Sequence, residues 1–338
     1  MANRETPISA LRTDITPVDL FFVRSHFPVP GVDRSSWRLS VKGEVDEAQE
    51  FSYSTLRRMP QRTVRVTMEC AGNGRTGFKE VATGELRWGL GAVSTASWTG
   101  VPLSLILEKA GVKKGANQVI AEGADEGHEP GTTKMMNFTR RLSIEKAMED
   151  GTILALKMNG KVLETQHGAP ARLIVPGWYA MASVKWVKAI RVLSGEPFSV
   201  FFNDTKYVYV KEKDGMEVKE PVTELRVKAL ITDPLDGGSA PMGSPLIIRG
   251  KAWSGSSNIV GVQIDLGNGW EDADVDPQTS GRYAWTGWRK KWVPRSRGSV
   301  TISVRAADRT GDMQPFEPMP NKYQYGYNAV HRIRIDIV

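Results

Sequence analysis

From residue 220 to its end, the chain is a succession of short β-strand patterns with no helical periodicity between them. Branched and aromatic residues alternate with polar ones, and turn signals such as Gly267-Asn268-Gly269 separate the runs. Strands at such regular spacing pair with their neighbours, so residues 220–338 are predicted to form an antiparallel β-sandwich. The expected strands are ELRVKALITDP, SPLIIRGKAW, NIVGVQIDLG, YAWTGWRKKWV, GSVTISVRAAD and HRIRIDIV.

Residues 1–210 combine strand and helix patterns without strict alternation, which favours an α+β domain with a mixed sheet. The patterns at 36–45, 62–69, 152–160 and 171–177 predict strands. VPLSLILEKAGV and LSIEKAMED predict short amphipathic helices, the first with Pro102 in its opening turn. The polar stretch at 203–221 is interpreted as a connector between two domains.

The single cysteine, Cys70, excludes both an intrachain disulfide and a zinc cluster built on cysteines. The four histidines are far apart and lack paired zinc-ligand spacing. No run of 18 apolar residues occurs, so no membrane span is expected. The N-terminal sequence has neither an apolar core nor twin arginines, so this form shows no export signal and favours the cytoplasm unless a signal was removed.

The net charge of +7 is compatible with nucleic acid, an acidic partner or an anionic ligand. The basic residues are spread along the chain, without a run of five or more Lys or Arg. Aromatic-basic motifs of the kind that bind RNA are absent as well. This distribution disfavours a nucleic-acid partner and leaves an anionic ligand as the simpler interpretation.

The segment TMECAGNGRTGF surrounds Cys70 with a strand before it and a glycine-rich turn after it. Such a turn can leave backbone N–H groups free to form an anion-binding nest. The neighbouring Arg75 would lower the thiol pKa, and a thiolate is a soft ligand that suits transition metals. From spacing alone, a buried structural cysteine before a tight turn fits equally well.

Two other motifs point to different ligands but lack the required context. GNGRTG matches the glycine pattern of dinucleotide-binding folds, yet the following residues do not predict the helix that such a site needs. DADVD at 272–276 resembles the start of a calcium loop, but Pro277 stands where glycine is needed and Tyr283 where glutamate is needed. Both segments are interpreted as ordinary loops.

Four basic residues of the first domain lie in turn-rich segments, namely Arg24, Arg75, Arg172 and Lys185. Taken singly, each of them is interpreted as a surface charge. If the fold brings them together, they form a pocket for a phosphate or another oxyanion, which arginine binds through two parallel hydrogen bonds.

The chain resembles the sulfite oxidase family of molybdenum–pterin oxidoreductases along nearly its whole length. The motifs that carry the resemblance, in the family's order, are FFVRSHFPVP, ECAGNGR, WGLGAVSTASWTGVPL, EGAD, KMNG, HGAPARLIVPG and SVKWVKAIRV. The resemblance implies a molybdopterin-binding catalytic domain followed by an immunoglobulin-like sandwich that supports dimerisation.

The resemblance also implies residue roles. Cys70 is expected to ligate molybdenum, while Arg24, Arg75, Trp88 and Tyr207 are expected at the substrate, with the position of Tyr207 open to a shift of one residue. The residues expected to hold the pterin and its phosphate are Phe22, Val23, Arg24, Ser25, His26, Cys70, Asp125, His167, Arg172, Ser183, Val184 and Lys185.

These roles predict two-electron oxygen-atom transfer on a small oxyanion, with sulfite oxidation to sulfate as the first candidate. No haem-attachment motif is present, so electrons are expected to pass to an external acceptor, a cytochrome or another. Sulfite oxidisers of the family carry a further arginine before the closing motif, where this chain reads NKYQYGYNAVHRI with Lys322 as the nearest cation. The missing arginine keeps reduction of nitrate or a sulfoxide open as an alternative. A non-catalytic cofactor-carrying binding module is the alternative from outside the enzymes.

Overall fold

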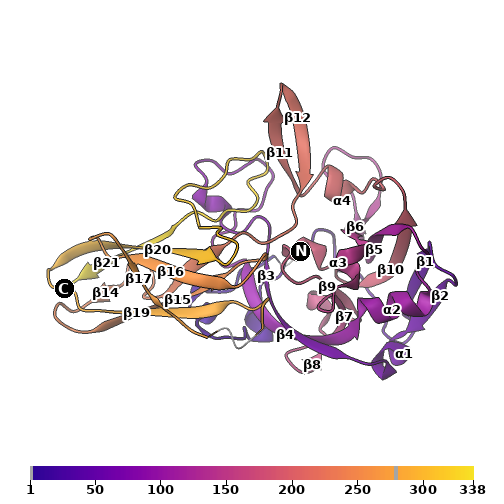
Figure 1. Ribbon diagram of the computed structural model, residues 1–338, viewed down its shortest axis with the longest axis horizontal. Helices are drawn as coiled ribbons and strands as arrows, with labels where there is room; N and C mark the ends of the chain where they lie inside the picture. The colour runs from indigo at the N-terminus through magenta and orange to yellow at the C-terminus, as the bar shows by residue number, and fades with distance from the viewer. Residues whose placement is uncertain (1–2, 278–280) are drawn as a thin grey trace.

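The computed structural model describes residues 3–277 and 281–338, which form two regions side by side (Figure 1). The first region contains the N-terminal two thirds of the chain, and the second is a β-sandwich that extends away from it. The longest helix in the described part, α2 (Leu103–Ala110), has only 8 residues. The protein is therefore mostly β with short helices. Of the expected α+β domain with a mixed sheet, the mixed sheet is present, whereas helices make up only a small part.

That mixed sheet has the strand order β2-β1-β10-β5-β6, in which β1 and β10 are parallel and the other neighbours antiparallel. Its strands are β1 (Arg38–Gly43), β2 (Gln49–Ser52), β5 (Ala116–Gly127), β6 (Met136–Ser143) and β10 (Val187–Ser194). A second sheet follows the order β3-β4-β7-β8, and β9 also pairs with β7. Its strands are β3 (Arg62–Glu69), β4 (Val93–Pro102), β7 (Ile153–Met158), β8 (Lys161–Val162) and β9 (Arg172–Ile174).

The helices of the first region are short and capped by local sequence. The α-helices are α1 (Tyr53–Arg58), α2, α3 (Ile144–Met148) and α4 (Phe201–Asp204). Ser52 and Ser143 cap α1 and α3 by accepting a backbone N–H in the first turn. Gly111 ends α2 in the left-handed conformation, which glycine adopts without strain. Both expected helices thus occur in place, but each is shorter than its pattern.

The segment 203–221 is not the connector that its polarity suggested. It completes α4 and then forms an antiparallel hairpin, β11 (Val208–Lys213) with β12 (Met216–Pro221), which projects from the body (Figure 1). Asp214 and Gly215 both have positive φ, 53° and 74°, as a two-residue hairpin turn of this hand requires. The Asp-Gly pair is the sequence signal that identifies the hairpin.

The second region is the expected antiparallel sandwich, with sheets in the orders β13-β15-β19-β18 and β14-β21-β20-β16-β17. Its apolar inner faces share one core, in which Ile248, Ile264 and Val304 are fully buried. The strands are β13 (Lys228–Asp233), β14 (Ser239–Ala240), β15 (Leu246–Trp253), β16 (Ile259–Asp265), β17 (Trp270–Asp272), β18 (Asp274–Val275), β19 (Thr286–Trp292), β20 (Gly298–Asp308) and β21 (His331–Ile337). Only the β14–β21 pair is parallel among these neighbours.

A buried polar network joins the two regions directly behind Cys70. Glu69, at the end of β3, accepts hydrogen bonds from Lys228 Nζ at 2.8 Å and Trp253 Nε1 at 2.9 Å, both from the sandwich. Asn73 donates to the same carboxylate at 2.9 Å. A buried charge is tolerated only when it is paired and hydrogen-bonded, so this network fixes the second region against the cysteine turn.

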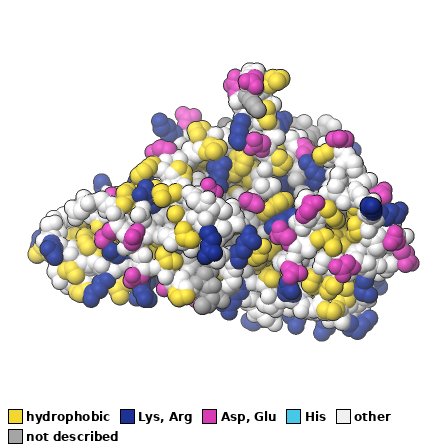
Figure 2. Space-filling model, viewed as in Figure 1, with side chains coloured by type: hydrophobic (Ala, Val, Ile, Leu, Met, Phe, Trp, Pro, Cys, Tyr) yellow, Lys and Arg dark blue, Asp and Glu magenta, His cyan; other side chains and the backbone are white. Residues whose placement is uncertain are grey.

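The outer surface carries charges of both signs. On the face shown in Figure 2, basic and acidic side chains are interspersed over both regions, without one large basic patch. No helix in residues 3–277 or 281–338 is long and apolar enough to cross a membrane.

Candidate active site

Cys70 lies where β3 ends, and its side chain lines two cavities. The cavities also share Arg24, His26 and Tyr207 as lining residues. We call them the inner cavity, which extends from Cys70 toward Arg172 and Lys185, and the outer cavity, which extends toward Arg75 and Trp88.

The turn after Cys70 does not form the expected anion-binding nest. The backbone N–H groups of residues 73–75 donate to the carbonyl groups of Cys70, Gly89 and Gly72 at 2.9, 2.6 and 3.1 Å. Two of these bonds stay within the turn and the third reaches the distant Gly89 carbonyl, so these three donors are not free for an anion. Among the contacts of the thiol, the Gly72 backbone provides a hydrogen bond.

The thiol pKa is not lowered, contrary to the expectation from Arg75. Burial raises the pKa of Cys70, and this effect exceeds the opposing influence of the Gly72 hydrogen bond, Arg24 and Arg75. Arg24 and Arg75 do lower the thiol pKa, but desolvation of the thiolate on burial raises it by more.

Two glycines make the turn possible. Gly74 has a φ of 82°, and a Cβ there would lie 2.5 Å from the ring of Tyr327. A Cβ on Gly72 would lie 2.6 Å from the guanidinium of Arg75, so only glycine lets that side chain fold back over the turn.

The inner cavity collects residues from distant segments of the first region. Its lining residues are Phe22, Val23, Arg24, His26, Cys70, Ala71, Asp125, Phe138, Gln166, His167, Arg172, Ala180, Met181, Ser183, Val184, Lys185 and Tyr207. Of the residues expected at a cofactor, Ser25 alone is missing from this lining, and its hydroxyl accepts a 2.7 Å hydrogen bond from Lys185. The inner cavity has about 630 Å³ of empty space, part of which is open to solvent.

The inner cavity holds buried cations without ion-pair partners. Arg172 donates only to the carbonyls of Ser183 and His167, at 3.2 and 3.3 Å. Lys185 donates to Ser25 and to the Gln166 carbonyl. No ion pair found within the described residues includes either of them. Burial lowers the pKa of Arg172 to about 9 and that of Lys185 well below its ordinary value. Such cations favour an anion in the cavity.

Two further polar side chains line the inner cavity, and they differ in hydrogen bonding: one oxygen of Asp125 has no partner, whereas the His167 ring has one. The Asp125 Oδ1 atom is buried without a hydrogen-bond partner, and burial raises the pKa of this carboxyl to about 6. His167 Nε2 lies 3.1 Å from the Val18 carbonyl, which fixes the ring, and burial lowers the pKa of His167 to about 4. Asp125 is thus free to accept N–H groups of a bound heterocycle.

The outer cavity is lined by Arg24, His26, Cys70, Gly72, Arg75, Gly84, Glu85, Leu86, Trp88, His128, Glu129, Pro130, Lys206, Tyr207 and Tyr325. Its cations differ from those of the inner cavity because a carboxylate stands between two of them. Glu85 Oε2 lies 3.1 Å from Arg75 Nη2, and Glu85 Oε1 lies 2.7 Å from Lys206 Nζ. Arg75 also donates to the Leu86 carbonyl at 2.8 Å and stacks over the ring of Tyr325.

Tyr207 is held at the junction of the two cavities in a strained backbone conformation. Its φ is 56°, which is unusual for a bulky residue and is maintained only by surrounding structure. Its hydroxyl lies 3.3 Å from His26 Nδ1. Burial raises the pKa of Tyr207 to about 12, so the hydroxyl keeps its proton.

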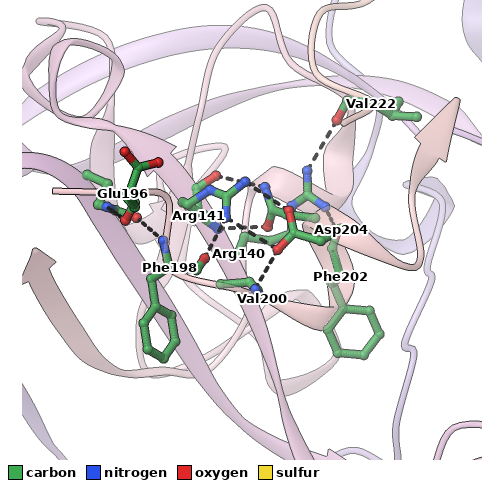
Figure 3. Close-up of polar contacts among 10 residues, drawn as sticks. Arg140, Arg141, Glu196, Phe198, Val200, Phe202, Asp204 and Val222 are labelled. Atoms are coloured by element: carbon green, nitrogen blue, oxygen red, sulfur yellow. Dashed lines mark hydrogen bonds and ion pairs between the residues drawn. The ribbon is translucent and has the colours of Figure 1, made fainter. Parts of the chain in front are cut away.

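The anchor that positions Tyr207 is built from Arg140 and Arg141 on β6 (Figure 3). Arg140 is fully buried and donates to the carbonyls of Phe202 and Val222, on either side of Tyr207 in the chain. Arg141 pairs with Asp204 at 2.9 Å. These contacts bind both α4 and the end of the hairpin to β6, so the chain is held on either side of Tyr207.

His26 connects Tyr207 to a second carboxylate. Its Nδ1 lies 3.2 Å from Arg24 Nη2, while its Nε2 contacts Glu129. Burial, followed by the charges of Arg24 and Lys206, lowers the pKa of His26 to about 3. The ring is therefore neutral near pH 7, accepting at Nδ1 and donating from Nε2 to Glu129.

The C-terminal segment contributes an aromatic residue where the resemblance led us to look for a cation. Tyr325 lines the outer cavity and stacks on Tyr207, with ring centroids 5.4 Å apart. Lys322 is half exposed and lies 4.0 Å from Glu217 of the hairpin. Lys322, the cation nearest in sequence to the closing motif, is thus not among the lining residues of the outer cavity.

Several residues of this site were not singled out in the sequence, namely Glu85, Glu129, Arg140, Lys206 and Tyr325. Lys206 directly precedes Tyr207, and this adjacency is the only local signal among them. The others reach the site through long-range contacts. The DADVD motif is not the ordinary loop that was expected, because Asp272 ends β17 and Asp274–Val275 form β18.

Models of known protein families match both regions of the chain. Residues 26–201 match the family model described as the oxidoreductase molybdopterin binding domain. Residues 219–338 match the Mo-co oxidoreductase dimerisation domain. The structure resembles that of the sulfane dehydrogenase SoxCD from Paracoccus pantotrophus, with a TM-score of 0.82, 29% identity, and 97% of this chain and 82% of that chain covered.

Sequence relatives include both oxidases and reductases. Mitochondrial sulfite oxidase from Rattus norvegicus is 32% identical over 99% of this chain and 64% of its own length, so the chain spans less than two thirds of that relative. Sulfite oxidase from Gallus gallus is 34% identical over 94% of this chain and 72% of its own length. Nitrate reductase [NADH] from Solanum lycopersicum is 32% identical over 99% of this chain and 40% of its own length. The chain therefore belongs to the sulfite oxidase family of molybdopterin oxidoreductases.

Proposed function

We propose that this protein is an oxidoreductase that binds a molybdenum–pterin cofactor in the inner cavity and oxidises sulfite to sulfate in the outer one. The observation that carries the proposal is a pair of buried cations outside any salt bridge of the described residues, Arg172 and Lys185, in the same cavity as the only cysteine. Such cations need an anion, and the phosphate of a pterin supplies it.

The residues present fit that cofactor. Cys70 would ligate the metal, because it lines both cavities and a thiolate is a soft ligand that suits transition metals. Arg172 and Lys185 would hold the phosphate, while Asp125 and His167 would contact the heterocycle. The remaining contacts are proposed for Phe22, Val23, Arg24, Ser25, His26, Ser183 and Val184. When bound, the cofactor supplies two-electron oxygen-atom transfer chemistry.

The outer cavity would bind and orient the substrate. Arg24 and Arg75 offer positive charge, Trp88 closes a wall, and the protonated Tyr207 hydroxyl offers a hydrogen bond at the junction. Fixed donors of this kind stabilise a developing oxyanion because they are already oriented before reaction. Sulfite oxidation takes one oxygen from water and releases two protons and two electrons. The electrons leave to an external acceptor, a cytochrome or another.

The test is steady-state turnover of molybdenum-replete protein with sulfite and an artificial electron acceptor. The proposal predicts sulfite-dependent reduction of the acceptor with formation of sulfate. Absence of that reaction, with nitrate or a sulfoxide being reduced instead, would contradict the assigned direction.

Reduction of nitrate or a sulfoxide is the second candidate, and one observation favours it. Tyr325 brings no charge to the outer cavity, whereas a doubly charged substrate profits from each additional cation. The relationship to nitrate reductase is as extensive along this chain as that to the sulfite oxidases. The same assay, run with reduced acceptor and nitrate, distinguishes the two directions.

For the domains, we propose a catalytic unit at 1–210 and an immunoglobulin-like dimerisation unit at 220–338. The sandwich topology and the dimerisation-domain match support this division. A two-fold homodimer is the commonest closed assembly. Light scattering at micromolar concentration should give the mass of two chains, and a strictly monomeric mass would contradict it.

A further inference from the structure

Glu85 has no role in the function proposed above, although it lines the outer cavity between two of its cations. Its two carboxylate oxygens each take one cation, Oε2 with Arg75 and Oε1 with Lys206. Its side chain is 13% exposed and that of Arg75 only 3%. Two oxygens between two cations is also how a bound oxyanion would be held. Glu85 thus takes the contacts that a substrate oxyanion would otherwise make.

The position of Glu85 is set by its loop. Ala82 donates its N–H to the Gln324 side chain at 2.7 Å, and Glu85 donates its own N–H to the Ala82 carbonyl at 3.1 Å. Gln324 in turn donates to the Glu80 carbonyl. Because Gln324 of the second region holds the loop at Glu80 and Ala82, the carboxylate of Glu85 is part of the built cavity.

The charges of the cavity then favour a particular substrate class. The cations of its lining are Arg24, Arg75 and Lys206, and the carboxylates are Glu85 and Glu129. From the side chains alone, three positive and two negative charges leave one net positive charge that the protein offers to a substrate. A singly charged substrate balances it, whereas a dianion leaves an excess negative charge in a partly buried site, which is costly.

We propose that Glu85 is a specificity-determining residue that selects singly charged or neutral oxo substrates over doubly charged oxyanions. This proposal rests on the proposed function, because it assigns the substrate to the outer cavity. For sulfite chemistry, it means that hydrogensulfite is taken in preference to the dianion.

The experiment measures binding of two unreactive probes by calorimetry, sulfate as the dianion and nitrate as the monoanion, under oxidising conditions without an electron donor. Cofactor-loaded wild-type protein is compared with Glu85→Gln and with Glu80→Gln. Glu80 lies on the same loop but is exposed, so its change alters charge outside the cavity. We expect Glu85→Gln to bind sulfate at least about tenfold more tightly and to change nitrate affinity far less. Glu80→Gln should stay within about twofold of wild type, since surface charge is screened.

A sulfate affinity of Glu85→Gln within twofold of wild type, or an equal gain for nitrate, would overturn the proposal. Should Glu85→Gln fail to fold, Lys206→Gln tests the same balance. Losing that cation should weaken sulfate binding by at least about threefold, and unchanged binding would overturn the proposal.

The binding result is distinct from the outcome of the turnover assay. A sulfate gain in Glu85→Gln without any sulfite turnover would contradict the proposed reaction and leave charge selection standing. Sulfite turnover with an unchanged sulfate affinity in Glu85→Gln would support the proposed reaction and contradict charge selection by Glu85.

Discussion

The inner and outer cavities meet at Cys70 but balance their charges in opposite ways. In the inner cavity, Arg172 and Lys185 bond to carbonyls and a hydroxyl, and no carboxylate pairs with them. In the outer cavity, Arg75 and Lys206 share Glu85. The difference suggests that the inner site is built for a permanent anion, while the outer site must remain stable each time its ligand leaves.

This comparison separates residues that the chemistry needs from residues that only retain the cofactor. Loss of an inner cation should reduce cofactor content, whereas loss of an outer cation should spare it and weaken substrate binding. Each of the following changes tests one side of that division.

The largest effect is expected for Cys70→Ser, at the point where the cavities meet. The hydroxyl is a hard group in place of a soft sulfur ligand, so turnover should be lost while the fold persists. Turnover and the thermal unfolding midpoint should be measured together on the same preparation. Wild-type turnover in the serine variant would show that the sulfur is not the ligand.

Arg172→Gln should remove a charge-assisted contact in the inner cavity, worth about 1.5–3 kcal/mol of cofactor binding. Pterin released from purified protein should therefore fall well below the wild-type amount. Arg75→Gln is the matched control from the outer cavity and should retain its pterin. Equal pterin content in both variants would remove the distinction between the cavities.

Asp125→Asn should alter the pH dependence of stability in the cofactor-free protein. Burial raises the pKa of Asp125 to about 6, so between about pH 4 and 6 the folded chain binds this proton more tightly than the unfolded chain. Stability from this group therefore falls as pH rises through that window, by roughly 2–3 kcal/mol. Burial also lowers the pKa of His26 and His167, which makes the stability of both proteins rise with pH, so the informative quantity is the difference between them. Denaturant unfolding at pH 4, 5, 6 and 7 should show the stability of the wild type, relative to that of the variant, declining across this window. A difference that stays constant with pH would contradict the assignment to Asp125.

The smallest effect is expected for Arg75→Ala in the outer cavity. We expect KM for sulfite to rise by roughly tenfold, or about 1.4 kcal/mol, because Lys206 still neutralises Glu85. The dependence of kcat/KM on ionic strength should flatten, since one cation that attracts the substrate is gone. A fall in kcat at unchanged KM would instead place Arg75 at the reacting atoms.

The sequence was most informative where local rules decide the structure. The strand at 62–69 coincides with β3, and the sandwich pattern after residue 220 corresponds to two sheets. The hairpin at 208–221 was overlooked because its polar outer end resembles a linker, while its Asp214-Gly215 turn was the decisive signal.

The candidate site shows the same division between local and long-range information. The order of the motifs predicted that Arg24, Cys70, Arg172 and Lys185 share one site, and all four line the inner cavity. Residue spacing alone did not decide whether they meet. The partners were not predictable, because Glu85 meets Lys206 across 121 residues. The anion nest was wrong for a similar reason, since the Gly74 donor is taken by the distant Gly89 carbonyl.

The most direct test of the account is the molybdenum and pterin content of the purified protein, made in cells that synthesise the cofactor. The inner cavity predicts close to one molybdenum and a matching amount of pterin per chain, both reduced together in Arg172→Gln. Folded protein that carries neither molybdenum nor pterin would contradict the central claim, whatever the turnover assays show.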